Sequence, residues 1–355
     1  MAHIDDLLKV TVENRASDLH LKAGGVPAVR IDGELIPKNE MPVMSAGDIN
    51  QVFAEMTTEE QRQLFIQNLE LDFAYQADGL GRFRVNAYLQ TGTISLACRP
   101  VRTDIPDIED LELPGVCKDL VLKRSGLIIV TGPTGCGKST TLAAMINYLN
   151  QKERRKMVTV EDPIEFMHQD GRCIFSQRAL GKDTRSFASA LKHALREDPD
   201  VILVGEMRDL ETMAITLTAA ETGHLVLTTL HSPGAPQAID RFIDVFPPHQ
   251  QQQVRIQLST SLEGVIYQTL VPRIEGSGRA AALEIMLASP AVRNLIRENK
   301  TYQIINAIQA GLQCGMQSLN QALLNLCRGG LISREEAMAR SADTGELKGM
   351  LESLR

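Results

Sequence analysis

A glycine-rich run with a lysine and a serine at fixed spacing is the segment of this chain best suited to bind phosphate. It matches the pattern G-x-x-x-x-G-K-[ST]. Glycines let successive backbone N–H groups face an anion, and the helix start behind them adds its positive dipole end. Lys138 would reach the β- and γ-phosphates of a nucleoside triphosphate, and the Ser139 hydroxyl would bind Mg²⁺. The predicted nucleotide-binding residues are Gly132, Pro133, Thr134, Gly135, Cys136, Gly137, Lys138, Ser139 and Thr140.

An acidic cluster follows the next apolar run of the sequence. Glu161, Asp162 and Glu165 place three carboxylates within five residues. Hydrolysis of a triphosphate needs an acid that orients the attacking water and others that hold hydrated Mg²⁺. The alternative is an ordinary acidic loop on the surface, which would carry no chemistry.

A single carboxylate, Glu206, follows the apolar run 201–204 and a glycine. An apolar strand that ends in an acid, downstream of the phosphate loop, is the expected place of the Walker-B carboxylate. Glutamate stands here where aspartate is usual, and Gly205 replaces a further apolar residue. The longer side chain would reach Mg²⁺ through water or polarise the nucleophile, and both roles stay open.

Two histidines flank the apolar run 225–230, with His224 before it and His231 after it. A histidine at a strand end commonly has a structural role, so neither one alone identifies a catalyst. His231 and the hydroxyls of Thr228 and Thr229 would lie at the carboxyl end of the strand, beside the expected γ-phosphate. This position favours a phosphate sensor for His231.

These groups need a parallel sheet that brings the strand ends together. Apolar runs alternate with helical segments from residue 126 onward, which predicts an α/β domain with a parallel sheet covered on both faces. The predicted strands are 127–131, 157–160, 201–204 and 225–230. We predict this domain over residues 116–355, with a helical region from about 285 to 355.

The first 100 residues have a different pattern and predict a small α+β domain. A helix over 4–15 precedes a hairpin that turns at Asp32-Gly33, and a helical stretch over 46–67 precedes a second hairpin that turns at Thr91-Gly92. Three prolines and five acidic residues between Pro100 and Gly115 predict a linker between the domains over 101–115.

The register of the second hairpin places Arg84 directly opposite Arg99. In this register Leu89 faces Ile94 and the other apolar side chains share one face of the pair. Like charges at cross-strand positions are destabilising unless an acid or anion offsets them. The two arginines are therefore either solvated on an exposed face or a clamp for an anion, and the pattern leaves both open.

Composition limits the class of protein. The chain has 355 residues, which suits about two domains, and a net charge of −7. This acidic balance argues against nonspecific nucleic-acid binding. Six dispersed cysteines without a C-x-x-C pair indicate neither a zinc ribbon nor a disulfide framework. With no apparent signal segment and no long apolar run, the sequence predicts a soluble, cytoplasmic protein.

The four clusters, in their order, resemble the secretion-ATPase superfamily: Walker A, an aspartate box over 158–165, the atypical Walker B Gly205-Glu206, and a histidine box over 218–232. Within it the chain looks like the PilT-type twitching-motility ATPases, which power retraction of type IV pili. The similarity runs nearly end to end and includes a segment over 291–298 that is associated with retraction.

The resemblance implies a PAS-like N-terminal domain, a RecA-like ATPase domain and a homohexameric ring that uses ATP and Mg²⁺. It implies Glu165 as the general base, Glu206 as the Walker-B acid that also contacts the metal, and His224 and His231 as histidine-box residues. Arg84 and Arg99, with Arg82 as a candidate third member, would approach the phosphates from the N-terminal domain. This favours the clamp interpretation.

The same resemblance implies where such a ring works and with what. It would lie in the cytoplasm, peripheral at the inner-membrane base of the pilus machine, and turn a platform protein there. An accessory retraction ATPase is a further candidate partner.

Relatives that share all four boxes supply the alternatives. Pilus-extension and type II secretion ATPases usually carry a larger N-terminal region and a four-cysteine zinc insertion, neither of which is found here. Accessory retraction ATPases are closer in length, and segment 291–298 is the main reason to prefer the retraction type.

The sequence disfavours two further classes of protein. A nucleic-acid-translocating RecA-like motor is disfavoured by the acidic charge and the aromatic content of 4%. A regulatory module that binds nucleotide with little turnover is disfavoured by the carboxylates Glu165 and Glu206.

Overall fold

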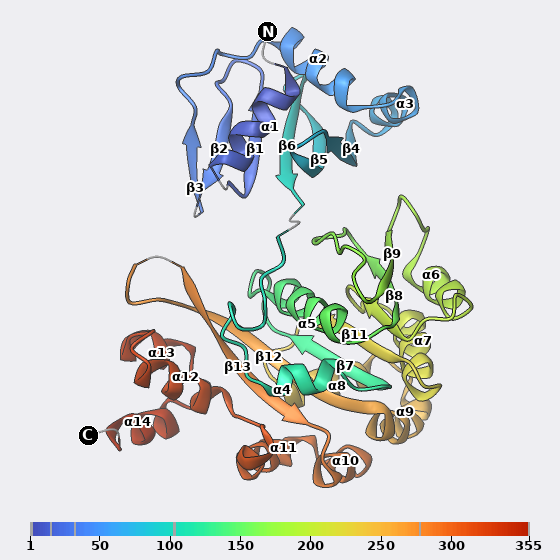
Figure 1. The fold of residues 1–355 in the computed structure, drawn as a ribbon, viewed down its shortest axis with the longest axis vertical. Helices are drawn as coiled ribbons and strands as arrows, with labels where there is room; N and C mark the ends of the chain where they lie inside the picture. Colours follow the sequence, from blue (N-terminus) through green and yellow to red (C-terminus); the bar gives the residue numbers. More distant parts are fainter. Residues whose placement is uncertain (1–2, 15, 32, 102–103, 277, 354–355) are drawn as a thin grey trace. The chain divides into compact units, whose positions relative to one another are not determined.

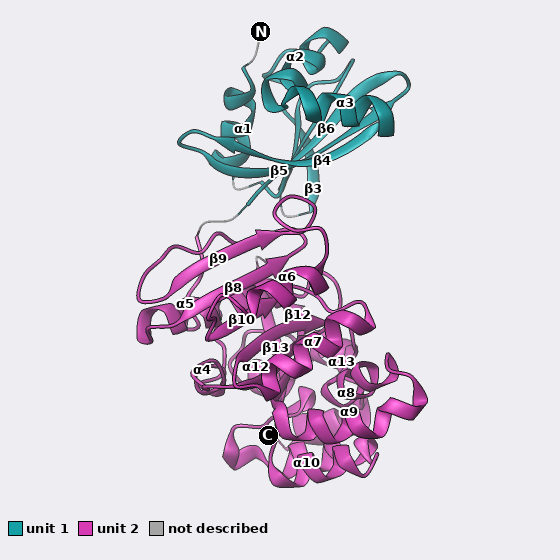
Figure 2. Ribbon diagram, turned by 90° about the vertical axis from the view of Figure 1, so that its right-hand side faces the viewer, with its two compact units in different colours: residues 1–103 teal, residues 104–355 magenta. Residues whose placement is uncertain are grey.

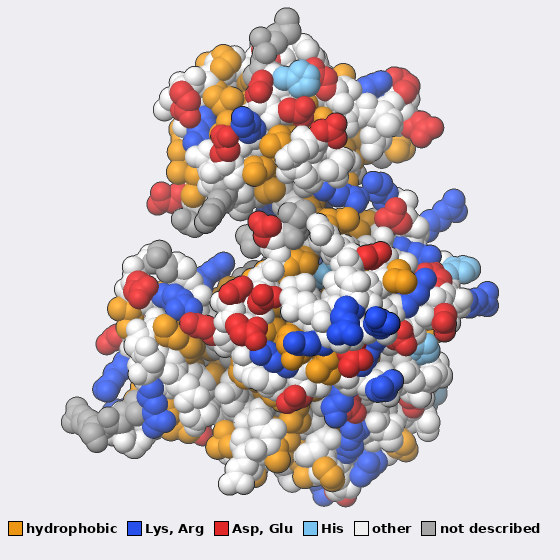
Figure 3. All heavy atoms as spheres, in the orientation of Figure 1, with side chains coloured by type: hydrophobic (Ala, Val, Ile, Leu, Met, Phe, Trp, Pro, Cys, Tyr) orange, Lys and Arg blue, Asp and Glu red, His pale blue; other side chains and the backbone are white. Residues whose placement is uncertain are grey.

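The computed structural model describes residues 3–14, 16–31, 33–101, 104–276 and 278–353. The chain forms two compact units, residues 1–103 and 104–355 (Figures 1 and 2). Both units carry acidic and basic side chains on the face shown in Figure 3.

The described part of the first unit contains one antiparallel sheet of six strands in the order β3-β2-β1-β6-β5-β4, with helices packed on one face (Figure 1). The core between sheet and helices includes Leu8, Leu21, Phe53 and Phe83, all buried. This confirms the predicted α+β class. The elements are α1 (Ile4–Glu13), β1 (Asp18–Lys22), β2 (Ala28–Ile31), β3 (Glu34–Pro37), α2 (Ala46–Met56), α3 (Glu59–Asn68), β4 (Glu70–Ala77), β5 (Gly81–Gln90) and β6 (Thr93–Pro100).

The predicted register of the second hairpin is confirmed. Arg84 lies opposite Arg99, and Leu89 lies opposite Ile94. The turn residues Thr91 and Gly92 both have positive φ, 47° and 78°. Two positive φ values are the requirement of the type I′ turn that suits the right-handed twist of a two-residue hairpin.

The helical stretch predicted over 46–67 is two helices rather than one. Thr57 and Thr58 have extended backbone, and Thr58 begins α3 by accepting a hydrogen bond from the Gln61 N–H. A threonine hydroxyl at this position satisfies a donor that the helix start leaves unpaired. In the first hairpin, Asp32 of the predicted turn lies outside the described residues.

The second unit contains a sheet of seven strands among its described residues, in the order β13-β12-β7-β11-β10-β8-β9. All neighbours are parallel except β13, which is antiparallel to β12. The strands are β7 (Gly126–Thr131), β8 (Lys156–Glu161), β9 (Ile174–Ala179), β10 (Val201–Val204), β11 (Leu225–Leu230), β12 (Leu262–Pro272) and β13 (Arg279–Leu287). The predicted parallel α/β architecture is confirmed.

Helices cover both faces of this sheet. As a result, alternate side chains of β7 enter two different hydrophobic cores. Leu127 and Ile129 pack into one core, whereas Ile128 and Val130 pack into the other, together with α4 and α5. The helices are α4 (Val116–Val121), α5 (Lys138–Lys152), α6 (Phe187–Ala194), α7 (Leu210–Glu221), α8 (Ala235–Asp244), α9 (Pro248–Ser261), α10 (Pro290–Arg297) and α11 (Ile304–Ala310), with short 3₁₀ turns at Thr301–Gln303 and Leu312–Cys314.

The chain ends in three helices, α12 (Leu319–Arg328), α13 (Arg334–Arg340) and α14 (Thr344–Glu352). They form a bundle with a core of its own, in which Leu323 and Leu347 pack against Val271 of β12 and Ala282 of β13 (Figure 1). Ahead of the sheet, Ile108 of the segment 101–115 is buried in the core with α5. No helix of the described residues is both long and apolar enough to span a bilayer.

Candidate nucleotide-binding site

The phosphate loop joins the end of β7 to the start of α5, and its glycines Gly132, Gly135 and Gly137 all have positive φ. Gly132 has φ of 148° and Gly137 has φ of 86°. A Cβ atom on Gly132 would lie 2.3 Å from the backbone oxygen of Gln268, so no larger residue fits there. The positive φ of Gly137 lets the chain turn into the first residue of α5.

Lys138 extends back along this loop and is buried, with 8% of the residue exposed. Its Nζ atom donates hydrogen bonds to the carbonyls of Gly132 at 2.9 Å and Pro133 at 3.1 Å, and lies 3.4 Å from Nδ1 of His231. Burial lowers the pKa of Lys138, although the charges of Glu206 and Glu165 act in the opposite direction. The lysine is thus a cation held at the mouth of a cradle of backbone N–H groups, where phosphate oxygens would compete for its protons.

Glu206 and His231 face one another at the ends of β10 and β11. The Nε2 atom of His231 lies 3.4 Å from Oε1 of Glu206, and Arg208 donates a hydrogen bond of 2.7 Å to Oε2. The bond from Arg208 lowers the pKa of Glu206, so this carboxyl is ionised. Burial and the charge of Lys138 lower the pKa of His231. A neutral imidazole that points its Nε2–H toward Glu206 and its Nδ1 lone pair toward Lys138 satisfies both contacts.

Sheet topology explains why these side chains meet. Strands β10 and β7 lie on either side of β11 and run parallel to it, so their carboxyl ends share one edge. The Thr229 hydroxyl donates a 2.6 Å hydrogen bond to the Gly205 carbonyl and joins two of these ends. A Cβ atom on Gly205 would lie 3.1 Å from Cα of Glu161, which explains the glycine before Glu206.

The acidic cluster contains one buried and one exposed glutamate. Glu161 is 8% exposed, and burial raises its pKa to about 7 despite hydrogen bonds from Thr159 and Gln177 that favour the ionised form. The backbone N–H of Glu165 also favours the ionised form of Glu161. Glu165 itself is exposed, and its charge acts on Lys138. The buried Glu161 thus helps to fix the loop that follows β8, whereas the exposed Glu165 is free to contact water.

His224 lies away from the other candidates. It precedes β11, whereas His231 follows this strand, and its Nδ1 atom lies 3.0 Å from the Ala219 carbonyl at the end of α7. The Thr222 hydroxyl lies 3.3 Å from the same nitrogen. Within one chain, His224 is therefore at the opposite edge of the sheet from Lys138.

Gln268 of β12 is a site residue that the sequence did not reveal. Its Nε2 atom donates a 2.6 Å hydrogen bond to the Cys136 carbonyl in the phosphate loop, and its Oε1 atom accepts one of 2.6 Å from the Thr141 hydroxyl on α5. The residue is 2% exposed. A glutamine within an apolar run signals a buried polar contact, but the sequence cannot name partners more than 120 residues away.

Arg84 and Arg99 of the first unit are each paired with an acid. Arg99 donates from Nε and a terminal nitrogen to Oδ1 of Asp18 at 2.9 and 2.7 Å, and Arg84 lies 3.7 Å from Asp72. These acids offset the cross-strand repulsion that the register implies. Arg82 lies two residues before Arg84 and on the same face of β5.

The donor set suits Mg²⁺ in the way that triphosphate sites hold it. A serine hydroxyl at position 139 and an ionised carboxylate at Glu206 are hard oxygen ligands. The described residues contain no cluster of three or more His, Cys, Asp or Glu that forms a metal cage. Magnesium is usually bound by one or two protein oxygens together with substrate phosphates and water, so these residues fit.

Comparison with known proteins places the chain in a family. Residues 2–285 match the family described as Type II/IV secretion system protein. The type IV pilus retraction ATPase PilT of Pseudomonas aeruginosa is 47% identical over 338 residues, which cover 95% of this chain and 98% of that protein. The type IV pilus ATPase PilU of the same organism is 40% identical over 347 residues, which cover 98% of this chain and 91% of that protein.

A crystal structure of the pilus retraction motor PilT with bound ADP matches with a TM-score of 0.92 at 46% identity, and covers 98% of this chain and 100% of that one. The match extends over nearly the whole chain and confirms the predicted fold class, a RecA-like P-loop domain preceded by a smaller PAS-like domain and followed by C-terminal helices. The chain is therefore a member of the type II/IV secretion system protein family.

Proposed function

We propose that this chain is an ATP-hydrolysing motor that drives retraction of type IV pili. The observation that carries the proposal is the 47% identity to a pilus retraction ATPase over 95% of the chain. It is supported by the site itself, where Lys138, Glu206 and His231 meet beside a glycine-rich loop.

The site suggests a role for each side chain in hydrolysis. Lys138 binds the β- and γ-phosphates, and Ser139 with Glu206 holds Mg²⁺, which supplies a counter-charge for the phosphate oxygens. Glu165, exposed on its loop, is the general base for the attacking water. His231 contacts both Lys138 and Glu206, so a change at the γ-phosphate reaches the start of α8 through it.

The arginines of the first unit complete the proposal. Arg84 and Arg99, with Arg82 on the same face, supply positive charge to the phosphates from the N-terminal domain. The chains form a homohexameric ring. Because the arginines and the phosphate loop belong to separate units, binding and loss of phosphate charge would move one unit against the other. Such motion is how hydrolysis would become mechanical work on an inner-membrane platform protein.

A second candidate function is that of an accessory retraction ATPase. The observation that favours it is the 40% identity to PilU over 98% of the chain. An accessory motor would work with a second ATPase on the same machine, and the hydrolysis site would be the same.

Pilus imaging in a strain that lacks this chain tests the direction of work. A retraction motor predicts hyperpiliated cells whose pili do not retract, whereas bald cells would assign the chain to extension. Normal retraction in this strain, lost only when a second ATPase is also deleted, would assign the accessory role. Stimulation of the purified ATPase by DNA would instead favour a nucleic-acid motor.

A further inference from the structure

One buried carboxylate of the second unit is not part of the proposed hydrolysis chemistry. Glu284 lies on β13 and is 7% exposed. Burial raises its pKa. A carboxylate in such a place is costly unless hydrogen-bond donors surround it.

The donors that meet Glu284 come from the starts of two helices. The backbone N–H of Ala235, the first residue of α8, donates a 2.7 Å hydrogen bond to Oε1. The backbone N–H of Leu319, the first residue of α12, favours the ionised form of the same carboxylate. Gly234 precedes α8 and supplies no side-chain cap, so Glu284 satisfies a donor that this helix start leaves unpaired. Two positive dipole ends thus meet on one negative charge.

Each of these helix starts leads to a different part of the unit. The α8 start is four residues after His231, the proposed sensor of the γ-phosphate. The α12 start belongs to the C-terminal bundle, and its next residue, Asn320, donates hydrogen bonds to the Asp343 carbonyl and to Glu346 and accepts one from Ser341. Glu284 therefore lies between the start of α12 and the segment 231–234 that joins β11 to α8, here called the histidine loop.

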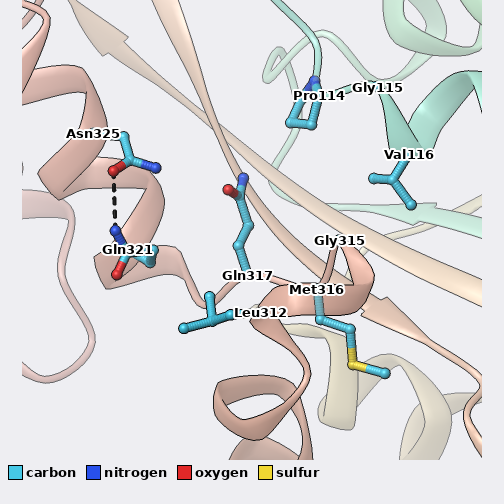
Figure 4. A pocket seen from close by; sticks show the side chains of 9 residues that line it. All are labelled: Pro114, Gly115, Val116, Leu312, Gly315, Met316, Gln317, Gln321 and Asn325. Atoms are coloured by element: carbon cyan, nitrogen blue, oxygen red, sulfur yellow. Dashed lines mark hydrogen bonds between the residues drawn. The ribbon is translucent and has the colours of Figure 1, made fainter.

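The position of the α12 start depends on its contacts with β13. Gln317 pairs with Ile285 through two backbone hydrogen bonds, and its side chain donates to the Leu283 carbonyl. These bonds hold the start of α12 against β13. Gln317 and Gln321 also line an open pocket with a volume of about 420 Å³. The 114–116 segment borders this pocket (Figure 4).

We propose that Glu284 is a positioning residue that couples the C-terminal bundle α12–α14 to the histidine loop of the nucleotide site. The coupling rests on the ATPase proposed above and adds a route by which a load on the bundle changes hydrolysis. The phosphate loop has its own attachment to the same hairpin through Gln268. Loss of Glu284 therefore disturbs His231 and leaves nucleotide binding by the loop in place.

Steady-state ATPase kinetics of the full-length protein test this coupling. Glu284→Gln keeps the shape of the side chain but turns an NH₂ group toward one of the two N–H donors. We expect kcat to fall by roughly tenfold or more, as small misplacements of catalytic groups do, with KM changed less than twofold. Asn320→Ala loosens the other end of the link and lowers kcat in the same way, although Asn320 lies in the C-terminal bundle.

A helix cap in the same bundle provides the matched control. Ser333 accepts a hydrogen bond from the Glu336 N–H at the start of α13 and has no part in the contacts of Glu284. Ser333→Ala should lower the thermal midpoint of unfolding and leave kcat unchanged. In the Glu284→Gln background, Asn320→Ala should have no further effect on kcat, because both changes break one link.

Three results would overturn the coupling: an unchanged kcat in Glu284→Gln, independent multiplication of the two effects, or an equal loss of kcat in Ser333→Ala. If Glu284→Gln does not fold, the comparison of Asn320→Ala with Ser333→Ala decides the question. A wild-type protein that does not hydrolyse ATP would refute the proposed function. The ATPase activity of the wild-type protein is therefore measured before that of any variant.

Discussion

One oxygen of Asp18 accepts two hydrogen bonds from Arg99, the arginine that lies opposite Arg84 in the β5–β6 hairpin. Burial opposes ionisation of Asp18, but hydrogen bonds from Ser17 and Arg99 hold its pKa below the usual value. The guanidinium is thereby fixed on its strand through two nitrogens of the fork, and its third nitrogen is left for another anion.

Asp18→Asn should therefore weaken the contact that fixes the Arg99 guanidinium and should destabilise the first unit. We expect kcat to fall severalfold and the free energy of unfolding to drop by about 2 kcal/mol, the size of a hydrogen bond to a charged group. The depressed pKa means that this stability is present above about pH 4 and is lost as the pH falls further. ATPase assays and chemical denaturation measure the two effects. Asp72→Asn, at the exposed partner of Arg84, should change stability by less than half as much.

Replacement of the loop lysine tests the nucleotide site directly. Lys138→Ala removes the cation that reaches the phosphates, and kcat should fall by roughly a hundredfold or more. The ring should still assemble, because the other contacts of the loop remain. Lys152→Ala, at the far end of the same helix, is the control and should keep wild-type turnover. Full turnover by Lys138→Ala would refute the assignment.

The two histidines should behave differently. His231→Ala removes the imidazole that contacts both Lys138 and Glu206, and it should lower kcat by roughly tenfold or more. His224→Ala should cost about 1 kcal/mol of stability, because its contact with the Ala219 carbonyl is lost. Phosphate-release assays and thermal unfolding of both variants measure this. Equal losses of kcat would mean that His224 also acts in hydrolysis.

Local pattern predicted much of this fold, because some elements carry their own signal. Strands 201–204 and 225–230 are found at the predicted bounds, since a strand buried on both faces is a continuous apolar run. The β5–β6 register followed from Thr91-Gly92 and strict alternation of apolar residues.

Contacts between distant segments could not be predicted. The β12–β13 hairpin was missed because β12 follows α9 without a glycine or proline between them. Asp18 and Gln268 are ordinary polar residues until the fold brings Arg99 and the phosphate loop beside them. Strand-end positions indicated that Glu206 and His231 meet, whereas the burial of Glu161 depends on packing that one sequence does not display.

The buried Glu161 should make stability depend on pH near neutrality. Its pKa is raised to about 7 in the folded protein, so the ionised carboxylate is tolerated less well there than in the unfolded chain. As the pH rises from about 4.5 to 7, the unfolded state loses this proton first, and stability falls over that window. Glu161→Gln should flatten the pH dependence of the thermal midpoint. Thr159→Val removes a donor to the carboxylate and should extend the fall to higher pH.

Gln268 should control the shape of the phosphate loop. Gln268→Leu has a similar size but leaves the Cys136 carbonyl and the Thr141 hydroxyl without their partner, which should cost about 2–4 kcal/mol of stability. A loop that moves by a fraction of an ångström presents its N–H groups poorly to phosphate, so the Kd for nucleotide should rise by roughly tenfold. Titration with a fluorescent nucleotide and thermal unfolding measure the two effects.

A double-mutant cycle separates the loop contact of Gln268 from general loss of packing. Thr141→Val removes the second partner, and in the Gln268→Leu background it should cost less stability than alone, because the unpaired hydroxyl is gone. Thr269→Val is the control on the same strand, since successive residues of a strand point to opposite faces. It should leave nucleotide affinity unchanged. If Gln268→Leu binds nucleotide as tightly as Thr269→Val does, the amide contributes only to packing of β12 and the loop keeps its shape through its glycines.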